Sequence, residues 1–151
     1  MNNNPLYSKY KKLVEQFDAL EKANYDSYKV FPPVTEEEIS NWEIENNVKL
    51  SPDLRNWYLL SNGLDMSHSA ELLPITSIKR FVCDEIEELE ECYIVGHYIG
   101  DGSMLVIDNN ENFYEFDHAY CKLHKMTFEA FLTEWVEDIA EDCMYEAGIL
   151  K

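Results

Sequence analysis

Three side chains that could bind a metal ion recur at intervals of three residues: His118, Cys121 and His124. On a helix this spacing would bring them together, and imidazole and thiolate are ligands that zinc prefers. A structural zinc site needs a fourth ligand, however, and the chain contains no Cys-x-x-Cys pair. Lys122 and Lys125 also place positive charge among the three candidates. The sequence therefore predicts no metal site, and nothing else in it indicates a cofactor.

The segment Asp108-Asn109-Asn110-Glu111-Asn112 places side-chain oxygens at its first, third and fifth positions, as a calcium-binding loop does. Phe113 stands where such a loop needs glycine, and Ala119 stands where it needs the closing glutamate. Asparagine and aspartate are also typical of tight turns. The segment is therefore predicted to be a polar hairpin turn.

No residue pattern in the chain identifies a catalytic site. The sequence has no Gly-x-Ser-x-Gly motif, and no serine or cysteine stands in a local context that predicts an activating histidine. Gly100-Asp101-Gly102-Ser103 joins two predicted strands, which favours a tight turn over the phosphate-binding start of a helix. Carboxylate pairs are uninformative because 30 of the 151 residues are acidic. We therefore expect no enzymatic activity.

The most acidic stretch of the chain carries six carboxylates in eight residues, with no basic residue among them: Asp84, Glu85, Glu87, Glu88, Glu90 and Glu91. Such a run is commonly a solvated loop or short helix. It could instead be a docking surface that steers a basic partner onto the protein. Both interpretations stand, and these six acids are the candidate partner-binding residues.

The charge of the whole chain points to the same class of partner. Lys and Arg total 12 and Asp and Glu total 30, which makes the formal net charge −18 at pH 7. Charge of this sign repels phosphate backbones and anionic membranes. The sequence therefore predicts a basic protein partner, no nucleic acid and no membrane.

Tyrosines in or beside the predicted strands are weaker candidates for binding residues. Side chains alternate between the two faces of a sheet, so about half of these tyrosines should face solvent. An exposed tyrosine beside acids makes a good interface anchor. Tyr98 and Tyr114 are the candidate anchors.

The elements that must position these residues begin with three helices. Apolar residues recur at helical spacing from Leu6 to Leu20, and the segment from Asn24 to Pro33 is predicted to be an extended connector. Thr35 and Glu38 form a capping box, which predicts a helix from Glu36. Ser51 and Pro52 are typical of a further helix start, and Asn62-Gly63 of its end.

Short strands and a final helix complete the chain. Strands are predicted at 72–75, where Pro74 favours a sheet edge, at 78–82, and in a meander at 93–99, 104–108 and 113–117. Thr127 caps a last helix, and its Phe128, Phe131 and Trp135 are predicted core residues together with Trp42 and Trp57. This order predicts a single α+β domain whose antiparallel meander is covered by N-terminal and C-terminal helices.

Residues 1–31 are expected to form the N-terminal helix and connector, and residues 32–151 the α+β domain, as one structural unit. The chain has four cysteines but shows no secretory leader and no apolar stretch long enough for a membrane span. We therefore expect a soluble protein in the reducing cytoplasm. The apolar helix faces could bury a dimer as readily as a core, which leaves a homodimer open.

The order of these signals resembles the SUKH superfamily, which includes a yeast cell-wall assembly regulator and many bacterial immunity proteins. The resemblance lies in 32–39, Trp42-Glu43, 48–54 and 60–63, in the strand at 72–75, in 94–96 and 100–108, in 113–118, and in the helix start at 127–132. It spans about Pro32 to Ile139 and leaves the N-terminal helix and the acidic run unmatched. Ser51-Pro52 also departs from the Leu-Pro type of link usual in the family.

The resemblance implies an α+β fold without enzymatic activity and, for bacterial members, neutralisation of a cognate toxin that is often a nuclease. A nuclease must present positive charge to nucleic acid, which matches the net charge of this chain. The first hypothesis is therefore a cytoplasmic bacterial immunity protein that occludes a basic nuclease domain stoichiometrically. The alternative is an adaptor or scaffold that binds peptides or proteins, with the tyrosine-rich sheet face as its site.

Overall fold

The computed structural model describes residues 8–25, 28–66, 70–81, 92–98, 103–117, 119–120 and 122–150. Helix α2 (Lys11–Lys22) and strand β1 (Tyr28–Lys29) precede helices α3 (Glu36–Asn46) and α4 (Pro52–Leu60). The sheet strands that follow are β2 (Leu64–Met66), β3 (Ala70–Leu72), β4 (Lys79–Phe81), β5 (Cys92–Tyr98), β6 (Ser103–Asp108), β7 (Phe113–Asp117) and β8 (Lys122–Met126). A 3₁₀ turn, η1 (Ile75–Ser77), links β3 to β4. The last helix runs through α5 (Phe128–Ala130), the π-helical η2 (Phe131–Val136) and α6 (Glu137–Glu146).

Helices α3, α4 and α5 begin where their capping residues predict. The Thr35 hydroxyl accepts a hydrogen bond from the Glu38 amide, and the Glu38 carboxylate accepts one in return, so the predicted capping box is confirmed. The Ser51 and Thr127 hydroxyls cap α4 and α5 by accepting hydrogen bonds from the Leu54 and Ala130 amides, without a reciprocal side-chain bond. Gly63 follows α4 with φ 111°, a backbone conformation that favours glycine. These local interactions place the helix starts.

Within the described residues, eight strands form one antiparallel sheet, seven of them in the order β1-β2-β3-β5-β6-β7-β8. β4 pairs with β5 beyond the end of β3, so β3 and β4 together line one side of β5. β5, β6 and β7 form the predicted meander. The prediction of a single α+β domain with an antiparallel sheet and helices from both ends of the chain is confirmed.

Several strand predictions were wrong in detail. β3 lies inside the sheet between β2 and β5, and Pro74 follows the strand, where it needs no ladder hydrogen bond. β1 lies within the segment predicted to be only a connector, and β2 was not predicted. β8 was missed because Lys122, His124 and Lys125 are exposed along it, as an edge strand allows, so the hydrophobic alternation is weak.

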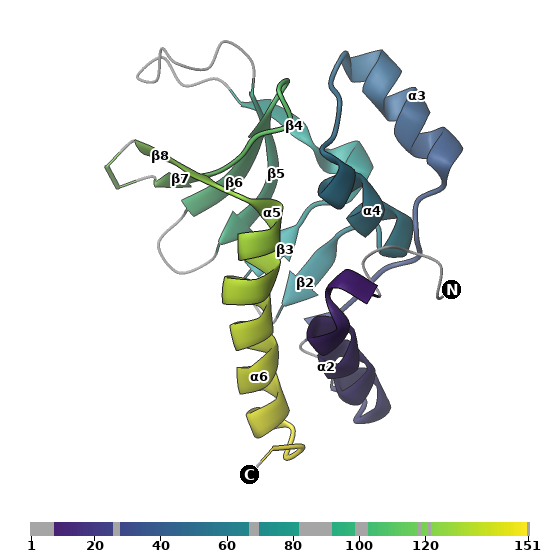
Figure 1. The fold of residues 1–151 in the computed structure, drawn as a ribbon, viewed down its shortest axis with the longest axis vertical. Coiled ribbons are helices and arrows are strands. Elements are labelled where there is room, and N and C mark those ends of the chain that lie inside the picture. Colours follow the sequence, from purple (N-terminus) through teal and green to yellow (C-terminus); the bar gives the residue numbers. More distant parts are fainter. Residues whose placement is uncertain are drawn as a thin grey trace.

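The main hydrophobic core lies between the helices and one face of the sheet (Figure 1). Trp57, 1% exposed, packs edge-on against Phe17 of α2 and Phe128 of α5. The predicted core aromatics Trp42, Phe128 and Phe131 are likewise buried. α2 lies alongside α6, so the N-terminal helix shares the core of the rest of the chain (Figure 1).

A second, smaller hydrophobic cluster lies on the opposite face of the sheet. Cys92, Val106 and Phe116 are buried there, and Phe81 and Tyr114 pack against them.

Among the described helices, none combines the length and the apolar character that a membrane crossing would need.

Candidate partner-binding surface

The predicted acidic docking residues Asp84, Glu85, Glu87, Glu88, Glu90 and Glu91 lie outside the described residues, so their role stays a prediction. The described strands nevertheless locate the two ends of this connection. β4 ends at Phe81 and β5 begins at Cys92, and these residues are paired directly. Cys92 is also paired with Asp108 at the end of β6. Phe81 and Cys92 therefore lie close to the turn between β6 and β7.

Asp108 organises that turn, as the prediction of a polar hairpin requires. Asp108 is 4% exposed, and its carboxylate accepts hydrogen bonds from the Asn110 and Asn112 amides, the Asn112 side chain and the Tyr114 hydroxyl, at 2.8 to 3.0 Å. Burial alone would raise the pKa of Asp108, but these bonds to the charged form lower it below its ordinary value. Burial and the bond to Asp108 raise the pKa of Tyr114 to about 12. Asp108 is therefore an ionised structural residue.

The two candidate tyrosine anchors are partly buried and lie on opposite faces of the sheet. Tyr98 packs on the helix side, its ring centroid 4.4 Å from that of Trp135. Tyr114 belongs to the second cluster and donates its hydroxyl hydrogen to Asp108. The structure therefore does not bring the two residues into one site, and their part in binding stays a prediction.

Of the three candidate metal ligands, only His124 lies within the described residues. His118 and Cys121 lie outside the described residues, and His124 lies on β8, an extended strand where sequence analysis had considered a helix. Across the described ranges, no three His, Cys, Asp or Glu side chains gather closely enough to hold a metal ion.

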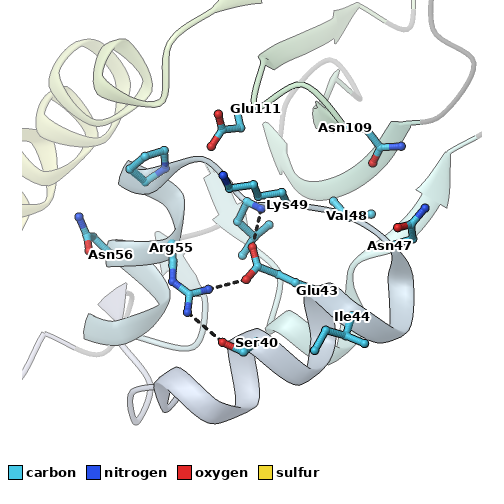
Figure 2. A pocket seen from close by; sticks show the side chains of 12 residues that line it. Ser40, Glu43, Ile44, Asn47, Val48, Lys49, Arg55, Asn56, Asn109 and Glu111 are labelled. Atoms are coloured by element: carbon cyan, nitrogen blue, oxygen red, sulfur yellow. Dashed lines mark hydrogen bonds and ion pairs between the residues drawn. The ribbon is translucent and has the colours of Figure 1, made fainter.

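A groove of about 860 Å³ lies between α3, the link to α4, the first turns of α4 and the β6–β7 turn. Its apolar floor includes Val48 and Leu50, which are 4% and 2% exposed. Lys49 from the link and Glu111 from the turn also line it (Figure 2). The groove thus brings two stretches that are distant in the sequence, 40–56 and the turn with Asn109 and Glu111, to one surface.

An ion-pair network holds the α3 wall of this groove against α4. The Arg55 guanidinium donates to Glu43 at 2.5 Å, to Glu36 at 2.6 Å and to the Ser40 hydroxyl at 3.1 Å. The second Glu43 oxygen accepts a hydrogen bond from the Leu50 amide at 2.9 Å. Figure 2 shows the Glu43 carboxylate between α3, Arg55 and the link. Because both Glu43 and Arg55 are mostly shielded from water, this network fixes the groove's shape.

Ile44 stands at the edge of the groove and is 78% exposed. Sequence analysis missed it, although its position carries a signal. Ile39 and Trp42 define the buried side of α3, and Ile44 lies on another side of the same helix. An apolar residue that lies off the buried stripe of a helix is a candidate for an interface.

Acidic side chains gather on the outward sides of two helices. α3 carries Glu37 and Glu45, which are exposed and have no ion-pair or hydrogen-bond partner in the described part of the chain. Glu134 of η2 and Asp138 of α6 are exposed in the same manner. Carboxylates outside the predicted acidic run therefore also contribute to the negative surface.

Comparison with known proteins identifies the family. No curated protein and no solved structure matches the chain. A family model described as the SMI1 / KNR4 family (SUKH-1) matches residues 33–134, more than half of the sequence. The match begins after α2 and β1 and ends before α6, so it covers the helices α3 and α4 and the strands from β2 to β8. The chain therefore belongs to the SMI1 / KNR4 family (SUKH-1), as the order of its sequence signals predicts.

Proposed function

We propose that this protein is a bacterial immunity protein that neutralises a cognate toxin by binding it stoichiometrically. Membership of the SMI1 / KNR4 family (SUKH-1) carries the proposal, because the resemblance implies this role for bacterial members. Neutralisation by binding requires a surface that covers the toxin and no catalytic group of the immunity protein's own.

We further propose that the toxin is a basic nuclease domain. The net charge of −18 supports this part of the proposal, because a nuclease presents basic residues to its substrate. A strongly acidic inhibitor attracts such a surface over distances near the Debye length. Association rates of complementary protein pairs reach about 10⁸ to 10⁹ M⁻¹s⁻¹ at low salt, against about 10⁵ to 10⁶ M⁻¹s⁻¹ without steering.

Co-expression in bacteria tests the proposal. The toxic C-terminal domain encoded beside this gene is induced with and without this protein, and survival is scored. We expect survival only in the presence of this protein, together with a one-to-one complex in size-exclusion chromatography. Continued killing without a complex would refute the proposal, and a pull-down that recovers several unrelated proteins and no toxin would favour the adaptor alternative.

The charge of the partner is tested separately with the purified complex. We expect the association rate to fall at least about tenfold between low and physiological salt, because screening removes the steering. A salt-independent association rate would contradict a basic partner while leaving neutralisation itself intact.

A further inference from the structure

The outward side of α3 differs from an ordinary solvated helix face. This side, which we call the α3 face, comprises Glu37, Asn41, Ile44 and Glu45 and is exposed throughout. Ile44 is 78% exposed, the highest fraction among the large hydrophobic residues that are exposed in the described part of the chain. A single exposed isoleucine is common in proteins, so its surroundings decide whether it matters.

The groove described above lies directly beside Ile44. Ile44 lies on its edge, next to Ser40 and Glu43 on the groove side of α3. Val48 and Leu50 extend the apolar surface into the groove's floor. Arg55 of α4 pairs with Glu36 and Glu43 of α3, which ties the groove's α3 wall to α4. A preformed, partly apolar hollow beside an exposed apolar side chain is what an interface anchor requires.

The side chains next to Ile44 on α3 are also negatively charged. Glu37 and Glu45 flank Ile44, and neither carboxylate has an ion-pair or hydrogen-bond partner among the residues that the structure describes. α3 itself contains no basic residue. Lys49 supplies positive charge at the groove, where Glu111 faces it as a carboxylate of the opposite wall (Figure 2). The rim around Ile44 is therefore negative and complements a basic surface.

We propose that the α3 face and the adjoining groove hold the basic toxin domain, with Ile44 as the apolar anchor and Glu37 and Glu45 as its charged rim. The occupant is a protruding loop of the toxin that places an apolar side chain against Ile44 and basic side chains beside the two carboxylates. This inference rests on the proposed function and assigns the binding surface within it.

The anchor is tested by Ile44→Ala, with Tyr145→Ala as the matched control. Tyr145 lies on α6 and is 51% exposed, so both variants remove an exposed apolar side chain from a helix. Alanine is the better helix former at both positions, so the fold is retained, which circular dichroism checks. With the toxin domain encoded beside the gene as probe, we expect Ile44→Ala to weaken binding at least about tenfold and Tyr145→Ala less than about twofold. Equal effects would overturn the assignment.

The charged rim is tested by Glu37→Lys with Glu45→Lys, and the control is Glu134→Lys with Asp138→Lys. Both double variants change the net charge equally at exposed carboxylates, so general steering changes equally. We expect the α3 pair to raise the dissociation rate at least about tenfold and the control pair to alter mainly the association rate. Dissociation rates that the α3 pair leaves unchanged would refute the rim. If the unmodified protein neither protects nor binds, the proposed function fails, whereas protection by every variant overturns only the α3 face.

Discussion

Gly96 of β5 has the closest contact to an added Cβ atom among the three glycines that the structure describes. It is paired with Leu72 of β3, and a Cβ atom at this position would lie 2.2 Å from the Glu71 carbonyl oxygen and 3.1 Å from Leu105 Cδ1. Carbon–oxygen contacts between neighbouring strands are normally about 3.3 Å or longer. Gly96→Ala would therefore force β3 and β5 apart by about 1 Å.

The magnitude follows from what that movement breaks. The closest atom belongs to the backbone, so no side-chain rotation relieves the clash. Overpacking costs about 1–3 kcal/mol, and each weakened backbone hydrogen bond of the three-residue β3–β5 ladder costs about 1 kcal/mol. We expect Gly96→Ala to lower the free energy of unfolding by about 3–4 kcal/mol, a large part of the 5–15 kcal/mol that is typical of a domain. For a chain of this length, the melting temperature should fall by about 10 °C.

Urea denaturation followed by circular dichroism measures this loss, with Gly148→Ala as the matched control. Gly148 has φ 77° and no heavy atom within 4 Å of an added Cβ, so alanine there costs only the conformational strain of about 1 kcal/mol. The difference between the two variants isolates the clash. A Gly96→Ala protein that loses no more stability than Gly148→Ala would refute the close approach of β3 to β5.

Three further changes test other parts of the structure. Phe17→Ala should lower the free energy of unfolding by about 3 kcal/mol, because the Phe17 ring packs on Trp57. In urea denaturation, a single transition would show that α2 unfolds with the domain, and a separate early transition would contradict this. Arg55→Ala should lower the free energy of unfolding by about 2 kcal/mol, because it leaves the Glu43 carboxylate without its cation. In a double-mutant cycle with Glu43→Gln, the two losses of stability should be coupled rather than additive. Because the pKa of Asp108 is lowered on folding, its ionised form stabilises the protein above its ordinary pKa of 3.8. The advantage of the native protein over Asp108→Asn, measured by urea denaturation across pH, should shrink as the pH falls below that value, and a constant difference would refute the role of the charge.

Short local patterns in the sequence predict where three of the helices begin and where the polar turn lies. Thr35, Ser51 and Thr127 cap helices through hydrogen bonds to amides three residues ahead, so a few neighbouring residues suffice to predict them. The polar turn after Asp108 and the meander strands are likewise encoded by short patterns. The family was also accessible, because the order of these signals is itself a sequence property.

Which side chains share a surface depends on how the strands pair and how the helices pack on them. β5 has a bulge between Ile94 and Gly96, which shifts the alternation of side chains by one position. Tyr98 therefore packs on Trp135 on the helix side of the sheet, while Tyr114 lies on the other face. A simple count along the strand cannot reveal this, because a bulge depends on the pairing with the neighbouring strand.

The groove beside α3 was inaccessible to sequence analysis for a related reason. Its walls come from α3 and the start of α4, and from the turn that contains Asn109 and Glu111, which lies far from these helices along the chain. Residues that meet only after the sheet and the helices have packed leave no periodic signal in the sequence. The sequence could mark Ile44 as an apolar residue off the buried stripe of its helix, but its exposure beside a hollow is a product of packing.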